Sequence, residues 1–263
     1  MTLSADSVVY SKLSTPGLKK PIEVYKASRR SKNIHVLING GMHGNETLSP
    51  EFVKWVKARY LSGTSELNKL KFDFSIDFLP VLNREGFEKK NRYNFRGVNL
   101  NRNFPVLWGI SRENPGLSPA SEPETKAIIS LFETRKYDVA IDIHGYVNWI
   151  VGPTSPELVE YLTKSEISKH HKHDHKEWTS SLKENLSSLN GYEFKTAGGL
   201  GDGGAFEDYA YWGAGAKTFC LEIHSRAKDA KHKLAEYKSY EIYIGKMIQK
   251  AHKMKNATNV ASN

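Results

Sequence analysis

The chain has 263 residues, 39% of them hydrophobic, which is enough to bury the core of one large α/β domain; we expect one domain rather than two. Lysine and arginine outnumber aspartate and glutamate by 38 to 29, and the formal net charge is +9. No basic run is interleaved with aromatic residues, so the charge indicates a mild attraction to anions and argues against a nucleic-acid partner.

The N-terminus and the cysteine content bear on the compartment. Residues 1–7 lack the basic start and apolar stretch of a secretory signal, and no segment is long enough to span a membrane. The single cysteine, Cys220, excludes an intramolecular disulfide and lies in an apolar run typical of a buried strand. These features predict a cytoplasmic protein without a membrane partner, or a periplasmic or secreted one if a leader was removed.

The first third of the chain is expected to build half of a sheet. Its strand-like segments cover residues 7–13, 21–26, 34–39 and 72–82, the first two forming an edge hairpin. Apolar residues at helical spacing predict a helix from Pro50 to about Tyr60, with Ser49 as its N-cap. The strand, helix and strand over 34–82 form the βαβ unit of a mainly parallel sheet, which places ligands at the carboxyl ends of its strands.

The remainder continues the α/β pattern. Residues 83–120 are polar and aperiodic, and a loop of this length is usually functional. A capping box at Ser121 to Glu124 predicts a helix through Phe132. Further strands are expected at 138–143 and 218–223, and further helices at 156–190, 206–212 and 231–255. We therefore predict one α/β domain over residues 1–255, with a mixed, mainly parallel, twisted sheet covered by helices on both faces, and a polar tail over 256–263.

Two segments resist assignment to the core. The sequence from Lys169 to Lys176 contains His170, His171, His173 and His175, and it is interpreted as a solvated connection between two helices, because no apolar frame surrounds the imidazoles. The glycine-rich residues 197–204 are expected to form a mobile loop over a site.

Polar residues at the ends of three predicted strands suggest a metal site. His43 and Glu46 follow strand 34–39, His144 follows strand 138–143, and Glu222 lies in the last strand. Two histidines and one carboxylate are the ligand set of a hydrolytic zinc site with a fourth position for water. Glu222 is a candidate base, because an apolar strand raises the pKa of a carboxyl group.

Taken singly, each of these residues has a simpler interpretation. His144 is compatible with an ordinary hydrogen-bonded histidine, and Glu222 with an ion pair or an outward-facing position. Arg92, Arg96 and Arg102 are compatible with a solvated surface. The hypothesis depends on all of them occurring together, in the order that one mechanism requires.

The motifs together resemble the zinc carboxypeptidases of the carboxypeptidase A type. The resembling segments are GGMHGNE at 40–46, NREGF at 83–87, RYNFRGVNLNRNFP at 92–105, SEPET at 121–125, DIHGY at 142–146, and Glu222. They cover most of residues 34–224. The pairing of the His-x-x-Glu loop with NLNRNFP is far more specific than either motif alone.

The resemblance implies the chemistry of the site. One Zn²⁺ ion is expected on His43, Glu46 and His144, with Glu222 as the general base and acid that acts on a zinc-activated water. One departure is Asn99, where the family usually has aspartate; an amide is the weaker acceptor, so zinc affinity is expected to be lower.

The resemblance also implies how a substrate is held. Arg92 matches the arginine that polarises the scissile carbonyl, and Asn101 with Arg102 matches the pair that binds a terminal carboxylate. Tyr146 matches a subsite tyrosine. A second departure is that Gly198 and Gly199 occupy the region where larger relatives carry a mobile tyrosine.

The expected partner is a peptide with a free C-terminal carboxylate, and the expected reaction is hydrolysis of its last amide bond. The chain looks most like the small bacterial enzymes that cleave the γ-D-glutamyl-diaminopimelate amide of murein peptides, with Asp202 or Glu207 facing the substrate's ammonium group. One alternative is an N-acyl amino acid hydrolase of the aspartoacylase or succinylglutamate desuccinylase type, against which the 92–105 block argues. The other is a non-catalytic zinc or peptide-binding relative.

Overall fold

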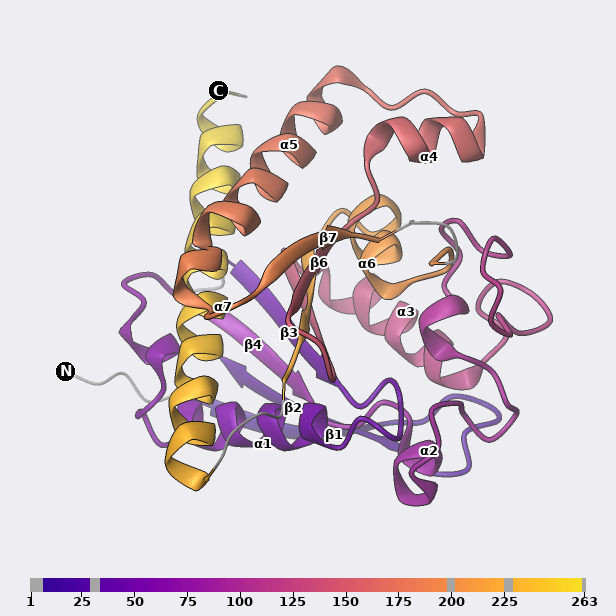
Figure 1. Ribbon diagram of the computed structural model, residues 1–263, viewed down its shortest axis with the longest axis horizontal. Coiled ribbons are helices and arrows are strands. Elements are labelled where there is room, and N and C mark those ends of the chain that lie inside the picture. The colour runs from indigo at the N-terminus through magenta and orange to yellow at the C-terminus, as the bar shows by residue number, and fades with distance from the viewer. Residues whose placement is uncertain (1–6, 29–33, 198–201, 225–228, 262–263) are drawn as a thin grey trace.

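The computed structural model describes residues 7–28, 34–197, 202–224 and 229–261. These residues form one eight-stranded sheet with helices on both faces (Figure 1). The strands are β1 Ser7–Leu13, β2 Ile22–Ser28, β3 Ile34–Gly40, β4 Phe74–Leu79, β5 Val139–His144, β6 Trp149–Gly152, β7 Glu193–Thr196 and β8 Lys217–Glu222. The helices are α1 Leu48–Leu61, α2 Arg84–Lys89, α3 Pro123–Arg135, α4 Pro156–Thr163, α5 Lys169–Glu184, α6 Phe206–Asp208 and α7 Ala230–Ala261. Short helical turns lie at η1 Glu66–Lys69, η2 Leu100–Arg102, η3 Asn185–Ser188 and η4 Tyr209–Gly213.

The strand order is β1-β2-β4-β3-β5-β8-β6-β7. The central strands β4, β3, β5 and β8 are parallel to one another, whereas β2 and β6 join them antiparallel. The hairpin of β1 and β2 lies at one edge, as predicted. The predicted fold class is therefore confirmed. Because β3, β5 and β8 are parallel neighbours, their carboxyl ends meet at one edge of the sheet.

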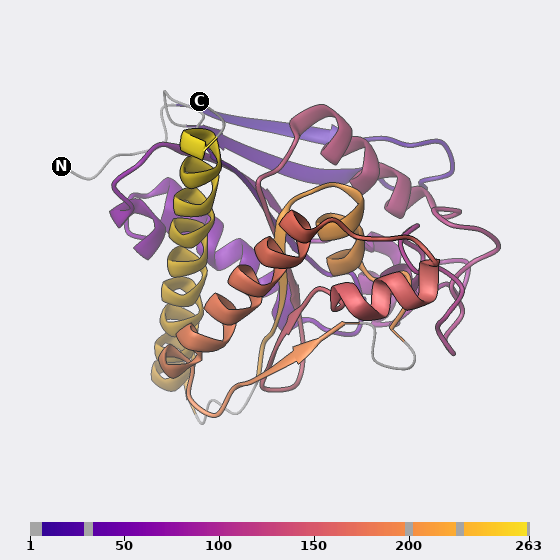
Figure 2. The ribbon, with the colours of Figure 1, turned by 90° about the horizontal axis from the view of Figure 1, so that it is seen from above.

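Alternation along the strands sorts side chains between two helical layers. On β3, Val36 and Ile38 belong to the core with α1, α5 and α7, whereas Leu37 belongs to the core with α3 and α6. On β5, Ile141 faces the first layer and Ala140 the second. Figure 1 and Figure 2 show α5 and α7 on one side of the sheet and α3 on the other. The same alternation decides which polar side chains can meet at the sheet edge.

The predicted N-cap of the first helix was wrong. Helix α1 begins at Leu48 with Thr47 as its N-cap, so Ser49 lies within the first turn. The hydroxyl of Ser49 accepts a hydrogen bond from Gly41 N at 2.9 Å and donates to Ile143 O. A buried hydroxyl gains more from satisfying these two backbone groups than from capping, and it ties the loop after β3 to β5.

The predicted capping box at the start of α3 was also wrong. The N-cap is Glu122, and its side chain makes no capping hydrogen bond. Ser121 Oγ instead accepts from Asn103 Nδ2 at 2.9 Å. This tertiary contact ties the start of α3 to the polar loop that precedes it.

The histidine-rich segment was wrongly interpreted as a connection between helices. It forms the first turns of α5, and the connection lies at residues 164–168. His175 is buried, and its ring stacks on Trp212 with the centroids 5.4 Å apart. The helical repeat turns this one imidazole toward the core, which polar composition alone does not reveal.

Helix α7 continues to Ala261, beyond Asn256, where we expected a polar tail to begin. The division into a domain over 1–255 and a tail stays a prediction. Residues 198–201 of the glycine-rich segment, including Gly198 and Gly199, lie outside the described residues. Within the described ranges, no helix has both the length and the apolar character needed to span a bilayer.

Candidate active site

The predicted site residues meet in one hollow of about 270 Å³ at the carboxyl ends of β3, β5 and β8. All eight line it: His43, Glu46, Arg92, Asn101, Arg102, His144, Tyr146 and Glu222. Strand parity explains the meeting of β5 and β8. Asp142, His144 and Ala140 occupy alternate positions of β5, so their side chains point to the same face of the sheet, the face covered by α3. Glu222 on β8 pairs in register with His144. Glu222 therefore points into the hollow, and the outward orientation left open by the sequence does not occur.

The loop after β3 is held against α2 by close backbone packing. A Cβ atom on Gly44 would lie 2.0 Å from the carbonyl carbon of Gly86, so only glycine fits there. At the start of the loop, Leu82 N donates to Gly40 O at 3.0 Å. This packing fixes the backbone on both sides of His43 and so aims its imidazole at the sheet edge.

Three potential ligands converge within hydrogen-bonding distance of one another. His43 Nδ1 lies 2.7 Å from Glu46 Oε1, and His144 Nδ1 lies 3.0 Å from Glu46 Oε2. The two Nδ1 atoms are 3.1 Å apart. All three side chains are buried, and together they form a group that could hold a metal ion.

The surroundings make both Nδ1 atoms lone-pair donors. His43 Nε2 lies 3.0 Å from Asn99 Oδ1, and His144 Nε2 lies 2.8 Å from Asp142 Oδ2, so each Nε2 carries its proton toward an oxygen. Arg92 Nη1, which can only donate, lies 3.1 Å from His43 Nδ1. Two imidazole lone pairs and a carboxylate facing each other repel unless a cation lies among them, so this donor set fits zinc.

The pKa values of the three groups reflect their mutual charges. Burial lowers the pKa of His43, and Glu46 opposes this only in part. Burial alone would raise the pKa of Glu46, but the charge of His144 and the hydrogen bonds of both imidazoles bring it below its usual range. Burial would lower the pKa of His144, yet the charges of Asp142 and Glu46 raise it well above its usual value. The local carboxylates thus favour positive charge at this position.

Glu222 has the environment of a proton acceptor poised near neutrality. Burial raises its pKa to about 7; the charge of His144 opposes this rise and that of Glu46 adds to it. Its Oε2 is buried and has no hydrogen-bond partner among the described residues. A carboxyl group with this pKa can both take a proton from water and return it.

Arg92 bridges the converging group and a neighbouring loop. Its Nη1 also lies 3.3 Å from Glu46 Oε1, and its Nε donates to Glu113 Oε2 at 3.2 Å. The guanidinium is therefore held in one plane beside His43 and Glu46, with one edge toward the hollow.

Asn101 and Arg102 sit side by side on the 3₁₀ turn η2. Asn101 Oδ1 accepts from Phe206 N at 2.7 Å, which leaves its Nδ2 without a partner in the described part of the chain. Arg102 Nη1 donates to Asn101 O at 2.6 Å, and its Nη2 donates to Asp202. Gly204 makes this packing possible, because a Cβ there would lie 2.1 Å from Arg102 O. Both side chains offer donors to an anion entering the hollow.

Tyr146 is half exposed at the rim of the hollow. Its hydroxyl donates to Asn45 O at 2.7 Å and accepts from Thr47 N at 2.9 Å. The tyrosine therefore braces the loop between Glu46 and α1, and it is one of the residues that line the hollow.

Glu207, in the short helix α6, also lines the hollow. It is 2% exposed, and its Oε1 has no hydrogen-bond partner among the described residues. Burial raises its pKa to about 8, and the charge of Asp142 adds to the shift. Asp202, the other acidic residue considered from the sequence, is instead paired with Arg102. A buried carboxyl with an unused oxygen is suited to a cationic or hydrogen-bond-donating ligand.

Two supporting residues were missed in the sequence. Asp142 orients His144, and Asn39 Nδ2 donates to Asp142 Oδ1 at 2.8 Å. The spacing of Asp142 and His144 was a usable signal, since residues two apart on a strand face the same side. Glu113 lies in an aperiodic loop and gave no signal.

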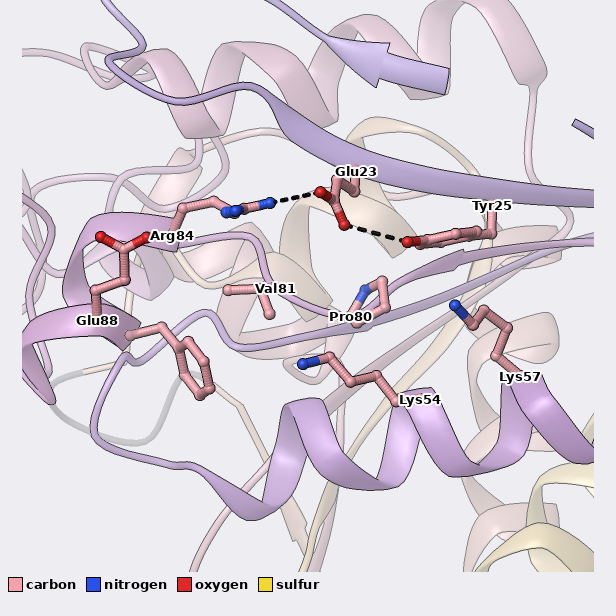
Figure 3. Close-up of a pocket in the computed structure, with 9 residues that line it drawn as sticks. Glu23, Tyr25, Lys54, Lys57, Pro80, Val81, Arg84 and Glu88 are labelled. Carbon is pink, nitrogen blue, oxygen red and sulfur yellow. Dashed lines mark hydrogen bonds and ion pairs between the residues drawn. The ribbon is translucent and has the colours of Figure 1, made fainter. Parts of the chain in front are cut away.

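A second hollow, of about 410 Å³, lies between α1, β2 and α2 (Figure 3). Arg84 Nη1 lies 2.9 Å from Glu23 Oε1, and Tyr25 OH donates to Glu23 Oε2 at 3.2 Å. Lys57 Nζ lies 3.4 Å from the centre of the Tyr25 ring. Glu23, Arg84 and Tyr25 thus pair with one another, and none of the described side chains of this hollow has a buried polar atom without a partner.

Comparison with known proteins points to one family. Residues 12–251 match the zinc carboxypeptidase family. Human carboxypeptidase O is 30% identical over 179 residues, which are 57% of this chain and 46% of that protein. Rat mast cell carboxypeptidase A is 29% identical over 161 residues, or 51% of this chain and 39% of that protein. The matched region thus spans less than half the length of these curated relatives.

Solved structures show the same fold at low sequence identity. Thrombin activatable fibrinolysis inhibitor superposes with a TM-score of 0.73 at 21% identity, covering 94% of this chain and 72% of that one. Murein-tripeptide amidase MpaA from Escherichia coli superposes with a TM-score of 0.57 at 18% identity, covering 94% of this chain and 93% of that one. An aspartoacylase family protein from Mesorhizobium loti superposes with a TM-score of 0.59 at 19% identity, covering 95% of this chain and 69% of that one.

Proposed function

The chain belongs to the zinc carboxypeptidase family, and from this premise we propose that it hydrolyses the C-terminal amide bond of a peptide in a zinc-dependent reaction. The observation that carries the proposal is the convergence of His43 Nδ1, His144 Nδ1 and the Glu46 carboxylate, with both Nε2 protons committed elsewhere. Two imidazole nitrogens and one carboxylate are the donor set of a catalytic zinc site, so the group is suited to one divalent cation.

His43, Glu46 and His144 would hold the zinc ion. When bound there, zinc supplies Lewis acidity, which polarises a carbonyl and makes a water acidic near neutral pH. Glu222 takes the proton of the attacking water, because its carboxyl faces the hollow and its pKa is raised to about 7. The same carboxyl then returns the proton to the leaving amine. Arg92 donates to the carbonyl oxygen as negative charge develops on it.

Arg102 and Asn101 restrict the reaction to the chain end. A guanidinium and an amide N–H at one wall of the hollow bind a carboxylate in two directions. Asp202 occupies Arg102 Nη2 in this structure, so a substrate carboxylate exchanges one anion for another instead of meeting a bare guanidinium. This exchange lowers the cost of keeping Arg102 buried before substrate arrives.

For the substrate, we propose a murein stem peptide whose last residue is a diaminopimelate linked to a γ-D-glutamyl group. Such a residue carries an ammonium group besides its reacting amide and its carboxylates. The orphaned Oε1 of Glu207 supports this choice, because a cation entering the hollow would meet it and stabilise its ionised form.

The test is an assay of the purified, zinc-loaded protein by mass spectrometry. The substrates are a γ-D-glutamyl-diaminopimelate peptide, ordinary peptides with free and amidated C-termini, N-acetylaspartate and succinylglutamate. We expect release of the last residue from peptides with free C-termini only, fastest with diaminopimelate. Turnover of the N-acyl amino acids alone would instead assign the aspartoacylase-type reaction, and zinc binding without any turnover would indicate a non-catalytic relative.

A further inference from the structure

Behind the converging group lies a carboxylate that the sequence did not single out. Glu113 Oε2 accepts from Asn99 Nδ2 at 2.7 Å, and Asn99 Oδ1 lies 3.0 Å from His43 Nε2. Glu113 Oε2 also accepts from Arg92 Nε at 3.2 Å, and Glu113 Oε1 accepts from Arg92 Nη2 at 3.4 Å. One line of hydrogen bonds therefore runs from His43 through Asn99 to Glu113.

The loop that carries Glu113 is tied to the strand-like segment that carries Asn99. Asn99 N donates to Asn114 O at 3.0 Å, and Asn114 Nδ2 donates to Gly97 O at 3.0 Å. Ser111 Oγ accepts from Glu113 N at 3.0 Å. The position of the carboxylate is therefore set by local backbone contacts on both sides, although the side chain is one-third exposed.

A neutral amide can point either end toward a histidine, and only its partners decide which. A carboxylate accepts hydrogen bonds but cannot donate them, so Glu113 requires the NH₂ end of Asn99. Asn101 N donates to Asn99 Oδ1 at 3.0 Å and agrees with this orientation. Asn99 Oδ1 then faces His43, which keeps the imidazole proton on Nε2 and the lone pair on Nδ1.

We propose that Glu113 is a positioning residue for the metal site: acting through Asn99, it fixes the tautomer of His43 and increases the basicity of its Nδ1. Asn99 lacks the negative charge of an aspartate, and Glu113, the next residue along the line of hydrogen bonds from His43, supplies that charge. The hydrogen bond from Asn99 to Glu113 polarises the Asn99 amide, so that its Oδ1 becomes a stronger acceptor for His43. A carboxylate bonded directly to His43 would have the same effect more strongly. This inference rests on the proposed zinc site.

The test measures zinc affinity of the metal-free protein by competition with a chromogenic chelator, with no assay of turnover. Glu113→Ala and Glu113→Gln are expected to bind zinc about tenfold more weakly, at the lower end of the effect of outer partners on metal sites. Glu66→Gln, which removes a partly exposed carboxylate paired with Lys69 on η1, is the matched control and should leave the affinity unchanged.

The exchange variant separates positioning from a general structural role. Asn99→Asp combined with Glu113→Gln puts the carboxylate beside His43 and an amide donor behind it, so the line of hydrogen bonds is restored with its charge moved inward. We expect its zinc affinity to return to within about threefold of wild type or to exceed it. Circular dichroism checks that each variant is folded.

Each outcome decides something different. Wild-type affinity in both Glu113 variants would overturn the inference, as would an exchange variant that binds no more tightly than Glu113→Gln. Failure of the wild-type protein itself to bind zinc would instead overturn the proposed function.

Discussion

The hollow at the sheet edge and the hollow between α1, β2 and α2 differ less in size than in the state of their polar groups. In the hollow of about 410 Å³ between α1, β2 and α2, Glu23 pairs with both Arg84 and Tyr25, and Lys57 lies over the Tyr25 ring (Figure 3). In the hollow of about 270 Å³ at the sheet edge, lone pairs face each other, and buried oxygen atoms of Glu207 and Glu222 have no partner among the described residues.

The comparison shows that volume does not identify an active site. Buried polar groups without partners cost free energy, and a fold retains such groups where a ligand supplies the partner. Substitutions should therefore act on metal, turnover and specificity at the sheet edge, and only weakly on stability in the other hollow. The predictions below run from the largest expected effect to the smallest.

The largest effect is expected from His43→Ala, which removes one of three proposed ligands. Loss of a residue that only supports a ligand can weaken zinc binding by about 100-fold. Loss of a ligand itself should weaken zinc binding more than that. Atomic absorption after dialysis measures the zinc content, and Lys57→Ala in the other hollow is the control. A stoichiometric zinc content in His43→Ala would remove this residue from the ligand set.

Glu222→Gln should leave zinc bound and lower kcat by about 10²- to 10⁴-fold, because the amide cannot take the proton of water. The variant keeps the shape of the side chain, so a loss of folding is not expected. Single-turnover kinetics on the best peptide, together with the metal content, give both quantities. Near-normal turnover would exclude Glu222 as the base.

Arg102→Gln should lower kcat/KM by about 10- to 100-fold, the value of one hydrogen bond to a charged group. The loss should fall mainly on KM, because the guanidinium binds the carboxylate in ground and transition states alike. Peptides with an amidated C-terminus are expected to be poor substrates of the wild type, and their turnover should respond little to this substitution. An equal loss on both kinds of peptide would place the carboxylate elsewhere.

Glu207→Gln should reduce the preference for a last residue with an ammonium group by about tenfold relative to a neutral one. The shape of the pocket is unchanged, so turnover of neutral peptides should be close to that of the wild type. Competition between the two peptides in one reaction, followed by mass spectrometry, measures the ratio directly. An unchanged ratio would separate Glu207 from substrate recognition.

The smallest effect is expected in the second hollow. Glu23→Gln breaks the pair with Arg84, which is partly exposed, so the free energy of unfolding should change by no more than about 1 kcal/mol. Zinc content and turnover should not change. Urea denaturation measures the stability, and a large loss of activity in this variant would show that the two hollows are coupled.

The fold and the converging residues were accessible from the sequence because each has a local signature. Apolar periodicity marks the central strands and most of the helices, although not the short strands β6 and β7. His43 lies in the loop after β3 and His144 is the last residue of β5, so both lie where parallel strands end. Even the orientation of Glu222 follows from strand parity, once the register with His144 is known.

The supporting contacts were not accessible, because they depend on tertiary structure. Ser49 and Ser121 have the sequence of N-caps but bind Ile143 O and Asn103 instead. Glu113 lies in a loop without periodicity, and only the folded backbone places it behind Asn99. His175 turns into the core because a helix forms where polar composition indicated a connection.

The most direct test of the central claim is anomalous scattering from crystals of the zinc-loaded protein, recorded on both sides of the zinc absorption edge. We predict one strong difference peak, from a zinc ion coordinated by His43 Nδ1, Glu46 and His144 Nδ1. We predict no peak in the hollow between α1, β2 and α2. A peak located elsewhere, for example among the histidines at the start of α5, with none between His43 and His144, would contradict the assignment of the active site.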